Sequence, residues 1–169
     1  MSQTTVVVGN PKAGSRTRRL AEEVAEQVGA RLGGGDRTVI ELAEHTGVLF
    51  DWSSPVVAGL VDQVLAADVV VVASPTFKGT YTGLLKVFLD RFGAGQLAGT
   101  PTVPVMTGGS PTHALAVEHS LRPLLVEIGA STPTKGLYVT EAEIEDPSVP
   151  VKAWLDVWGD VLVRATRPA

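Results

Sequence analysis

The hydrophobic positions along this chain follow two alternating patterns. Short runs rich in valine, isoleucine and threonine predict strands over residues 4–8, 37–42, 67–75, 102–107 and 136–140. Between them, apolar residues three and four positions apart predict helices over residues 15–30, 56–66, 81–92 and 113–128. The same spacing predicts a last helix that buries its aromatic face, with Trp154, Val157, Trp158, Val161 and Leu162 on one side. This alternation predicts an α/β fold, and we interpret residues 1–169 as one domain.

The third predicted strand, "ADVVVVASP", has the continuous valines that are typical of a parallel strand buried on both faces. Strands of this kind joined by helices predict an open, doubly wound parallel sheet, which binds ligands outside the carboxyl ends of its strands. The loops after the first, third and fourth strands are "GNPKAGSRT", "SPTFKGTYTG" and "TGGSPTH". These loops are rich in glycine, proline and hydroxyl groups, whereas the loop after the second strand is not. We therefore expect the ligand on these three loops.

Composition narrows the classes of function. A net charge of −4, with 44% hydrophobic and 19% charged residues, is ordinary for a soluble protein and argues against general nucleic-acid binding. The chain has no cysteine, so disulfides, thiolate catalysis and cysteine-bound metals are excluded. The three histidines are scattered, and no spacing predicts a metal site. We recognise no signal peptide and no apolar run long enough to span a membrane, so we expect a cytoplasmic location.

Three phosphate-binding motifs compete for the first loop. Gly9 and Gly14 have the glycine spacing of a Walker A loop, but Ser15 and Arg16 follow where that motif needs lysine and a hydroxyl residue. A dinucleotide fingerprint fails because Pro11 stands where it needs a second glycine. A single terminal phosphate at a helix N-terminus remains, with Ser15 as the N-cap and the first-turn N–H groups facing the anion.

Four of the fourteen lysine and arginine residues fall within one stretch of eight residues that begins in this loop: Lys12, Arg16, Arg18 and Arg19. Cations in the first turn of a helix oppose its dipole, so a bound anion would explain their presence there. The alternative is that these side chains only solvate the surface.

With these loops, the sequence resembles the NADPH-dependent FMN reductase family of flavodoxin-like proteins, and especially the flavin reductases that supply sulfonate monooxygenases. The resemblance implies a three-layer sandwich whose five-stranded parallel sheet has the order 2-1-3-4-5. The family's first loop reads roughly G-S-x-R-x-x-S-x-[ST/N]; here Asn10 replaces its first serine and Lys12 its arginine, while Ser15 and Thr17 match. By this resemblance, the FMN phosphate is held by Asn10, Lys12, Ser15, Arg16 and Thr17.

The other two loops match the family as well. Residues 74–86 fit its S/T-P-x-Y/F-x-x-x-x-S/T-G-x-x-K pattern, and the segment "TGGSPTH" fits its T-G-G-x…H pattern. The resemblance implies that one loop lies beside the isoalloxazine and that the other covers its second side. The residues concerned are Pro75, Thr76, Phe77, Lys78, Gly79, Thr107, Gly108, Gly109 and His113.

The implied reaction is hydride transfer from NAD(P)H to N5 of FMN, with NADPH and NADH both open as donors. No catalytic side chain is expected, because the flavin carries the chemistry. The resemblance also implies a homo-oligomer, a dimer or tetramer, that supplies reduced FMN to a partner monooxygenase. One alternative is an NAD(P)H:quinone or azo-dye reductase that keeps its FMN. Another is a flavodoxin-type electron carrier, although the T-x-T-G-x-T loop usual in flavodoxins is absent.

The predicted helix over residues 113–128 holds Pro123 well inside it, where a proline should kink the helix. By the resemblance, His119 stands where some sulfonate-linked members carry an inserted residue in a π-bulge at the subunit interface. The alternative is an exposed histidine beside a proline kink. Both interpretations stay open at this point.

Overall fold

A computed structural model describes residues 2–166 of the chain. Its one sheet contains β1 (Thr4–Val8), β2 (Arg37–Glu41), β3 (Val69–Pro75), β4 (Thr102–Gly108) and β5 (Leu137–Thr140). All neighbouring strands are parallel, and their order is β2-β1-β3-β4-β5, which confirms the predicted fold. The three central strands β1, β3 and β4 are buried along their whole length, which for β3 its continuous valines predicted.

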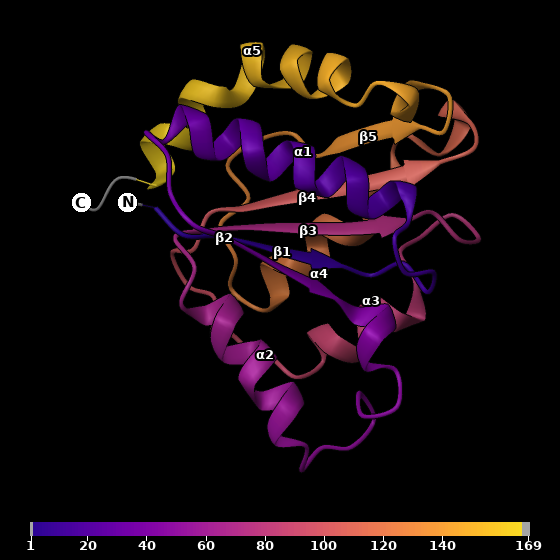
Figure 1. The fold of residues 1–169 in the computed structure, drawn as a ribbon, viewed down its shortest axis with the longest axis vertical. Coiled ribbons are helices and arrows are strands. Elements are labelled where there is room, and N and C mark those ends of the chain that lie inside the picture. Colours follow the sequence, from indigo (N-terminus) through magenta and orange to yellow (C-terminus); the bar gives the residue numbers. More distant parts are fainter. Residues whose placement is uncertain (1, 167–169) are drawn as a thin grey trace.

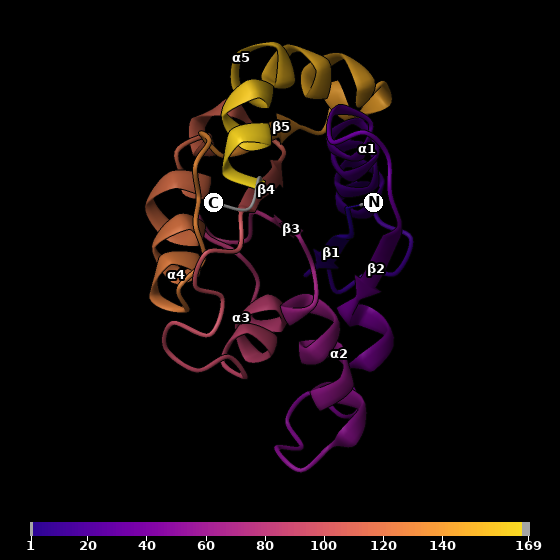
Figure 2. The ribbon, with the colours of Figure 1, turned by 90° about the vertical axis from the view of Figure 1, so that its left-hand side faces the viewer.

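Helices cover both faces of the sheet and form a three-layer sandwich (Figures 1 and 2). On one face lie α1 (Arg16–Arg31) and α5 (Ser148–Thr166); on the other lie α2 (Pro55–Leu65), α3 (Gly83–Leu89) and α4 (Arg122–Glu127). Successive residues of a strand point to opposite faces, so Val6 and Val8 pack towards α1 while Val7 packs towards α2 and α3. Each face of the sheet therefore has its own hydrophobic core.

The register of the strands brings their carboxyl ends to one edge. Val8 pairs with Glu41 and Ala73, and Pro75 pairs with Thr107. In Figure 1 the arrowheads of the strands point to the same side of the molecule, away from both chain ends. The three loops that we expected to bind a ligand consequently meet at this edge.

Side-chain caps set the starts of the helices beside these loops. Ser15 is the N-cap of α1, as predicted, because its Oγ accepts a hydrogen bond from Arg18 N at 3.2 Å. Thr82 caps α3 in the same way, accepting from Leu85 N at 3.1 Å. The cap starts α3 at Gly83, so Tyr81, which we placed inside the helix, lies ahead of it.

The predicted helix over residues 113–128 is only partly correct, because the continuous helical stretch covers residues 116–127 and is not regular α-helix throughout. The segment forms a 3₁₀ turn η2 (Pro111–His113), a π-helical turn η3 (Val117–Leu121) that contains His119, and then α4. Leu121 and Arg122 have α-helical backbone angles, so the helix continues from the π-helical turn through Pro123 without a break. The irregularity lies in the π-helical turn before the proline, which agrees with the π-bulge interpretation of His119.

The last helix buries only part of its predicted apolar face. Trp154 is 7% exposed and its Nε1 donates to the Lys135 carbonyl oxygen at 2.8 Å, and Trp158 packs half-buried on the same core. Val157 is 66% exposed, so its predicted place on the buried face is wrong. The buried face of the helix is turned relative to the predicted one, towards Leu155 and Gly159, which leaves Val157 exposed.

Candidate functional site

A cavity of about 360 Å³ lies at the carboxyl edge of the sheet, within the usual size range of small-molecule sites. Its walls contain Asn10, Lys12, Ser15, Arg16 and Thr17 from the first loop, Pro75, Thr76 and Phe77 from the third, and Thr107, Gly108 and Gly109 from the fourth. A larger cavity of about 480 Å³ lies by the end of α1 and the start of β2, at the opposite edge. Because ligands of such sheets bind at the carboxyl ends, the first cavity is the candidate site.

A chain of side-chain hydrogen bonds joins the first and fourth loops. Thr17 Oγ1 accepts from Asn10 Nδ2 at 3.0 Å and lies 2.9 Å from Thr107 Oγ1. Asn10 Oδ1 accepts from Lys12 N at 2.9 Å, which bends the loop ahead of the helix. Thr17 itself is 1% exposed, so the chain is an internal link of the site and not a surface contact.

The third loop is tied to its neighbours by hydrogen bonds that involve the backbone. Thr82 Oγ1 donates to the Gly9 carbonyl oxygen, and Thr82 N donates to Ser74 Oγ at 3.0 Å. Thr76 N donates to the Thr107 carbonyl oxygen at 2.7 Å, one residue beyond the end of β3. The three loops thus form one connected wall.

The amino end of α1 supplies donors for an anion. In the first turn of any α-helix the N–H groups have no intrahelical acceptor, and at α1 the Ser15 side chain satisfies only the one on Arg18. Lys12 lies on the adjoining loop, and within residues 2–166 it forms no ion pair. Arg16 lies on the same wall, with its Nη2 2.9 Å from Glu141 Oε1.

Arg18 has a structural role that the sequence did not reveal. Its Nη1 lies 2.6 Å from Glu41 Oε2 and its Nε 3.2 Å from Glu22 Oε1, and it is not part of the cavity wall. The hydrogen bond to Glu41 is the main reason why the pKa of Arg18 is raised, and that to Glu22 is the next. Arg18 is therefore neutralised by carboxylates of the chain itself. A bound anion is needed to explain only the other cations of the cluster.

Three predicted residues lie outside the cavity wall: Lys78, Gly79 and His113. Lys78 and Gly79 have φ values of 54° and 82°, and Phe77 and Thr80 pair across them, with Phe77 N donating to the Thr80 carbonyl oxygen at 2.8 Å. Two successive residues with positive φ form a tight hairpin turn, and this one places Lys78 at an exposed tip. His113 is exposed in η2.

Two wall residues that the sequence analysis did not predict, Glu141 and Ile144, follow β5. The loop after the fifth strand is not rich in glycine, so its composition carried no signal. The strand order did carry one, since β5 lies beside β4 and ends at the same edge. Gly14, in the first loop, is also part of the wall.

The wall matches the polar groups of a flavin mononucleotide. Free first-turn N–H groups and two cations suit a phosphate, and Thr76 Oγ1 is buried with no hydrogen-bond partner anywhere in residues 2–166. Over the same span, no three acidic or histidine side chains are grouped to hold a metal ion. No helix in this part of the chain is long and apolar enough to cross a membrane.

A five-stranded sheet in this order, with a polar cavity over a helix N-terminus, defines the flavodoxin-like class of proteins. The sequence profile of the NADPH-dependent FMN reductases matches residues 3–143, and this chain belongs to that family. The resemblance seen in the three loops is thereby confirmed.

Individual relatives agree with this assignment. The chain is 35% identical over 143 residues to the NADH-dependent FMN reductase SfnF of Pseudomonas putida, covering 82% of this chain and 77% of the relative. It is 33% identical over 159 residues to an FMN reductase (NADPH) of Pseudomonas aeruginosa, covering 89% and 85%. The apo crystal structure of the NADH:FMN oxidoreductase EMOB matches with a TM-score of 0.80 at 31% identity, covering 98% of this chain and 87% of that one.

Proposed function

We propose that this chain reduces FMN with NAD(P)H and that the cavity on the three loops is its flavin site. The observation that carries the assignment is the bonding of Thr17 to both Asn10 and Thr107. This link joins the helix N-terminus, the phosphate-type loop and the fourth loop into one site at the carboxyl edge. Membership of the FMN reductase family supports the class of reaction.

In this proposal the phosphate lies at the start of α1. The N–H groups of the first turn, Lys12 and Arg16 bind it, and Ser15 Oγ, which accepts from Arg18 N, still has a hydrogen to donate. The ring lies along Pro75, Thr76 and Phe77 and along the Gly108–Gly109 backbone. Contacts from Lys78, Gly79 and His113 remain a prediction of the family resemblance, because these residues lie outside the wall.

The chain's own residues bind and orient the flavin and leave a ring face accessible. Bound FMN supplies the redox chemistry by taking up hydride from the nicotinamide, so no acid–base pair is needed in the wall. Phe77 lines the cavity and is 52% exposed, which offers an apolar surface beside the ring where a nicotinamide can stack.

The test follows oxidation of NADH and of NADPH at 340 nm, with and without added FMN, FAD and riboflavin. We expect turnover that depends on FMN with at least one of the two nucleotides. Absence of such turnover with both would overturn the proposal. Binding titrations of the three flavins with the apoprotein identify the preferred one and show whether FMN is held tightly or exchanged.

We further propose that reduced FMN leaves for a flavin-dependent monooxygenase. In an anaerobic cell divided by a dialysis membrane, the protein, NAD(P)H and FMN stand on one side and cytochrome c on the other. Reduction of cytochrome c across the membrane is expected, because reduced FMN passes the membrane and the protein does not. Cells without the protein or without FMN are the controls, because NAD(P)H also passes. Yellow protein that keeps its FMN through desalting, with no reduction across the membrane, would support the quinone or azo-dye reductase instead.

The same proposal includes the organisation of the protein. We propose that residues 1–169 form one domain, since two cores share a single sheet. We also propose a homo-oligomer working in the cytoplasm, where its nicotinamide donor is found.

A further inference from the structure

We infer that Glu141 is an internal competitor of the flavin phosphate, which weakens FMN binding by occupying Arg16. This inference rests on the proposed function, because it takes the FMN phosphate as the ligand of the α1 N-terminus. It assigns a role to a residue that belongs to none of the three matched loops.

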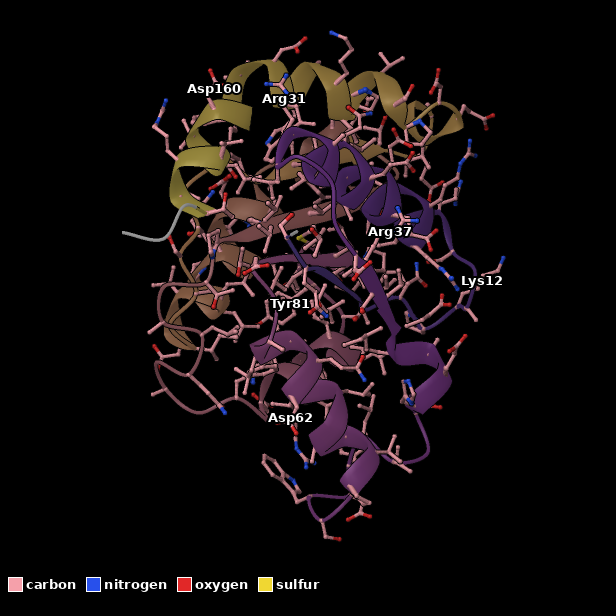
Figure 3. All side chains as sticks on the ribbon, turned by 60° about the vertical axis from the view of Figure 1, so that its left-hand side comes forward. Lys12, Arg31, Arg37, Asp62, Tyr81 and Asp160 are labelled. Carbon is pink, nitrogen blue, oxygen red and sulfur yellow. The ribbon has the colours of Figure 1, made fainter. Side chains whose placement is uncertain are left out.

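Glu141 and Arg16 face each other across the cavity wall. Arg16 Nη2 lies 2.9 Å from Glu141 Oε1, and both residues line the cavity. The only other lysine or arginine on the described part of this wall is Lys12, which projects from the loop ahead of α1 in Figure 3. The Arg16–Glu141 pair thus involves one of the wall's two cations.

The backbone fixes the position of Glu141. Its N–H donates to the Gly108 carbonyl oxygen at 2.9 Å, which continues the pairing of β4 and β5 by one residue. The residue before it is also held, since Thr140 N and Thr140 Oγ1 donate to Glu143 Oε2 at 2.8 and 2.6 Å. The carboxylate therefore extends from a fixed point on the wall towards the phosphate site.

Exposure distinguishes this pair from the other arginine pair at the same loop. The Arg18 partner, Glu41, is 3% exposed and also accepts from Gly14 N at 2.8 Å, so that pair is part of the fold. The Arg16 and Glu141 side chains are 60% and 50% exposed. Exposed pairs are weak, so an incoming phosphate can displace Glu141 from Arg16.

Displacing Glu141 from Arg16 makes the free energy of FMN binding less favourable. Once Arg16 turns to the phosphate, the Glu141 carboxylate remains beside a ligand that carries up to two negative charges, and like charges at short range repel. The bound state loses an ion pair and gains this repulsion. Both effects lower affinity for FMN and speed its release, which suits a flavin that is passed on, and neither acts on riboflavin, which has no phosphate.

The test compares the dissociation constants of FMN and riboflavin, measured by flavin fluorescence, for the wild type and Glu141→Gln. Asp62→Asn is the control, because it removes the same charge from α2, far from Lys12 in Figure 3. We expect Glu141→Gln to bind FMN about three- to tenfold more tightly and riboflavin unchanged, and Asp62→Asn to match the wild type. A tenfold change corresponds to about 1.4 kcal/mol.

A double-mutant cycle with Arg16→Gln tests the mechanism. Arg16→Gln should weaken FMN binding more strongly in the Glu141→Gln background than in the wild type, because the arginine is then fully available to the phosphate. Glu141→Ser, which removes the charge with a shorter side chain, should reproduce the tighter binding and guards against a folding defect in one variant.

Unchanged or weaker FMN binding in both Glu141 variants, or an equal gain for riboflavin, would overturn the inference. The proposed function is judged separately by FMN-dependent oxidation of NAD(P)H in the wild type. Turnover with no effect of Glu141 on affinity rejects the competitor role alone, whereas loss of turnover with both nucleotides rejects the function.

Discussion

At the scale of single residues, Thr17 connects the first loop of the site to β4. Its hydroxyl bonds to Asn10 on one side and to Thr107 on the other, and Thr107 is 90 residues away along the chain. The family resemblance implied a contact of Thr17 with the phosphate. The structure adds that this hydroxyl links the first loop to β4.

Thr17→Val tests this role with a side chain of nearly the same shape. The substitution leaves the buried Thr107 Oγ1 and the partly buried Asn10 Nδ2 with one partner fewer, which should lower the free energy of unfolding by about 1–3 kcal/mol. We also expect FMN affinity to fall about tenfold, because the phosphate loop loses its link to β4. Chemical denaturation and flavin titration measure the two effects.

Thr166→Val is the matched control for that experiment. Thr166 Oγ1 donates only to the Leu162 and Val163 carbonyl oxygens at the end of α5, on which the site does not depend. Flavin affinity equal in Thr17→Val and Thr166→Val would contradict the assembly role.

At the scale of elements, the π-helical turn η3 departs from regular α-helix and is held by a network of hydrogen bonds. Glu118 Oε1 accepts from Gly136 N at 2.6 Å, and Glu118 Oε2 accepts from Arg122 Nε at 2.6 Å. Arg122 also donates to the carbonyl oxygens of Thr132 and Thr134, at 2.8 and 2.6 Å. This network ties η3 and the start of α4 to the segment that leads into β5.

The charge of Glu118 makes this network dependent on pH. The hydrogen bond from Arg122, more than that from Gly136, holds the pKa of Glu118 below its ordinary value of 4.5. A carboxyl whose pKa is lowered by folding stabilises the protein above its unfolded-state pKa, and the contribution is lost as pH falls through the folded-state pKa. The affected window therefore lies at and below about pH 4.5.

Glu118→Gln should lower the free energy of unfolding at pH 7 by about 1–3 kcal/mol, because Arg122 loses its charged acceptor. The difference from the wild type should shrink as pH falls from about 4.5 towards the folded-state pKa. Urea denaturation at several pH values measures it. Glu127→Gln, at the exposed end of α4, is the control, and a difference that stays constant with pH would show that the charge of Glu118 does not contribute.

The same region shows where periodicity fails as a predictor. Apolar residues three and four apart predicted a helix over residues 113–128, with a kink at Pro123, but they did not show the π-helical turn, which needs only one extra residue per turn and leaves the apolar spacing almost unchanged. Pro123 indicated that this helix is irregular, but the irregularity is the π-helical turn ahead of the proline. The cap residue Ser15, by contrast, marked its helix start correctly because capping is a local interaction.

At the scale of the whole molecule, α4 and the segment ahead of η3 carry exposed apolar side chains. Val126 is 54% exposed on α4, and Leu115 is 70% exposed ahead of η3. Exposed apolar groups of this kind are candidates for burial between subunits. We therefore place the proposed homo-oligomer contact at these side chains.

Val126→Glu should shift the protein towards the monomer in sedimentation velocity, because a charge would have to be buried at the contact. Val157→Glu is the matched control, since Val157 is 66% exposed on α5, across the sheet from α4 (Figure 2). We expect that variant to keep the mass of the wild type, which should be at least twice that of one chain. Dissociation by Val157→Glu alone would move the contact to the α5 face.

The sequence by itself determined the elements, the parallel sheet and the three loops of the site. These follow from interactions between near neighbours: apolar periodicity, caps, and turn residues such as Lys78 and Gly79. Together with the family resemblance they also located most of the cavity wall.

Only the tertiary structure decided which charges meet. Arg18 is paired with Glu41 inside the fold, and Arg16 with Glu141 on the cavity wall, across strands whose separation in the sequence says nothing about their distance in space. Such pairs depend on strand order and register, which bring the ends of β2 and β5 to opposite sides of the α1 N-terminus. Local patterns do not encode through-space distances, and for that reason the sequence showed a cluster of cations, while the fold paired Arg16 and Arg18 with carboxylates and gave Lys12 no ion pair within residues 2–166.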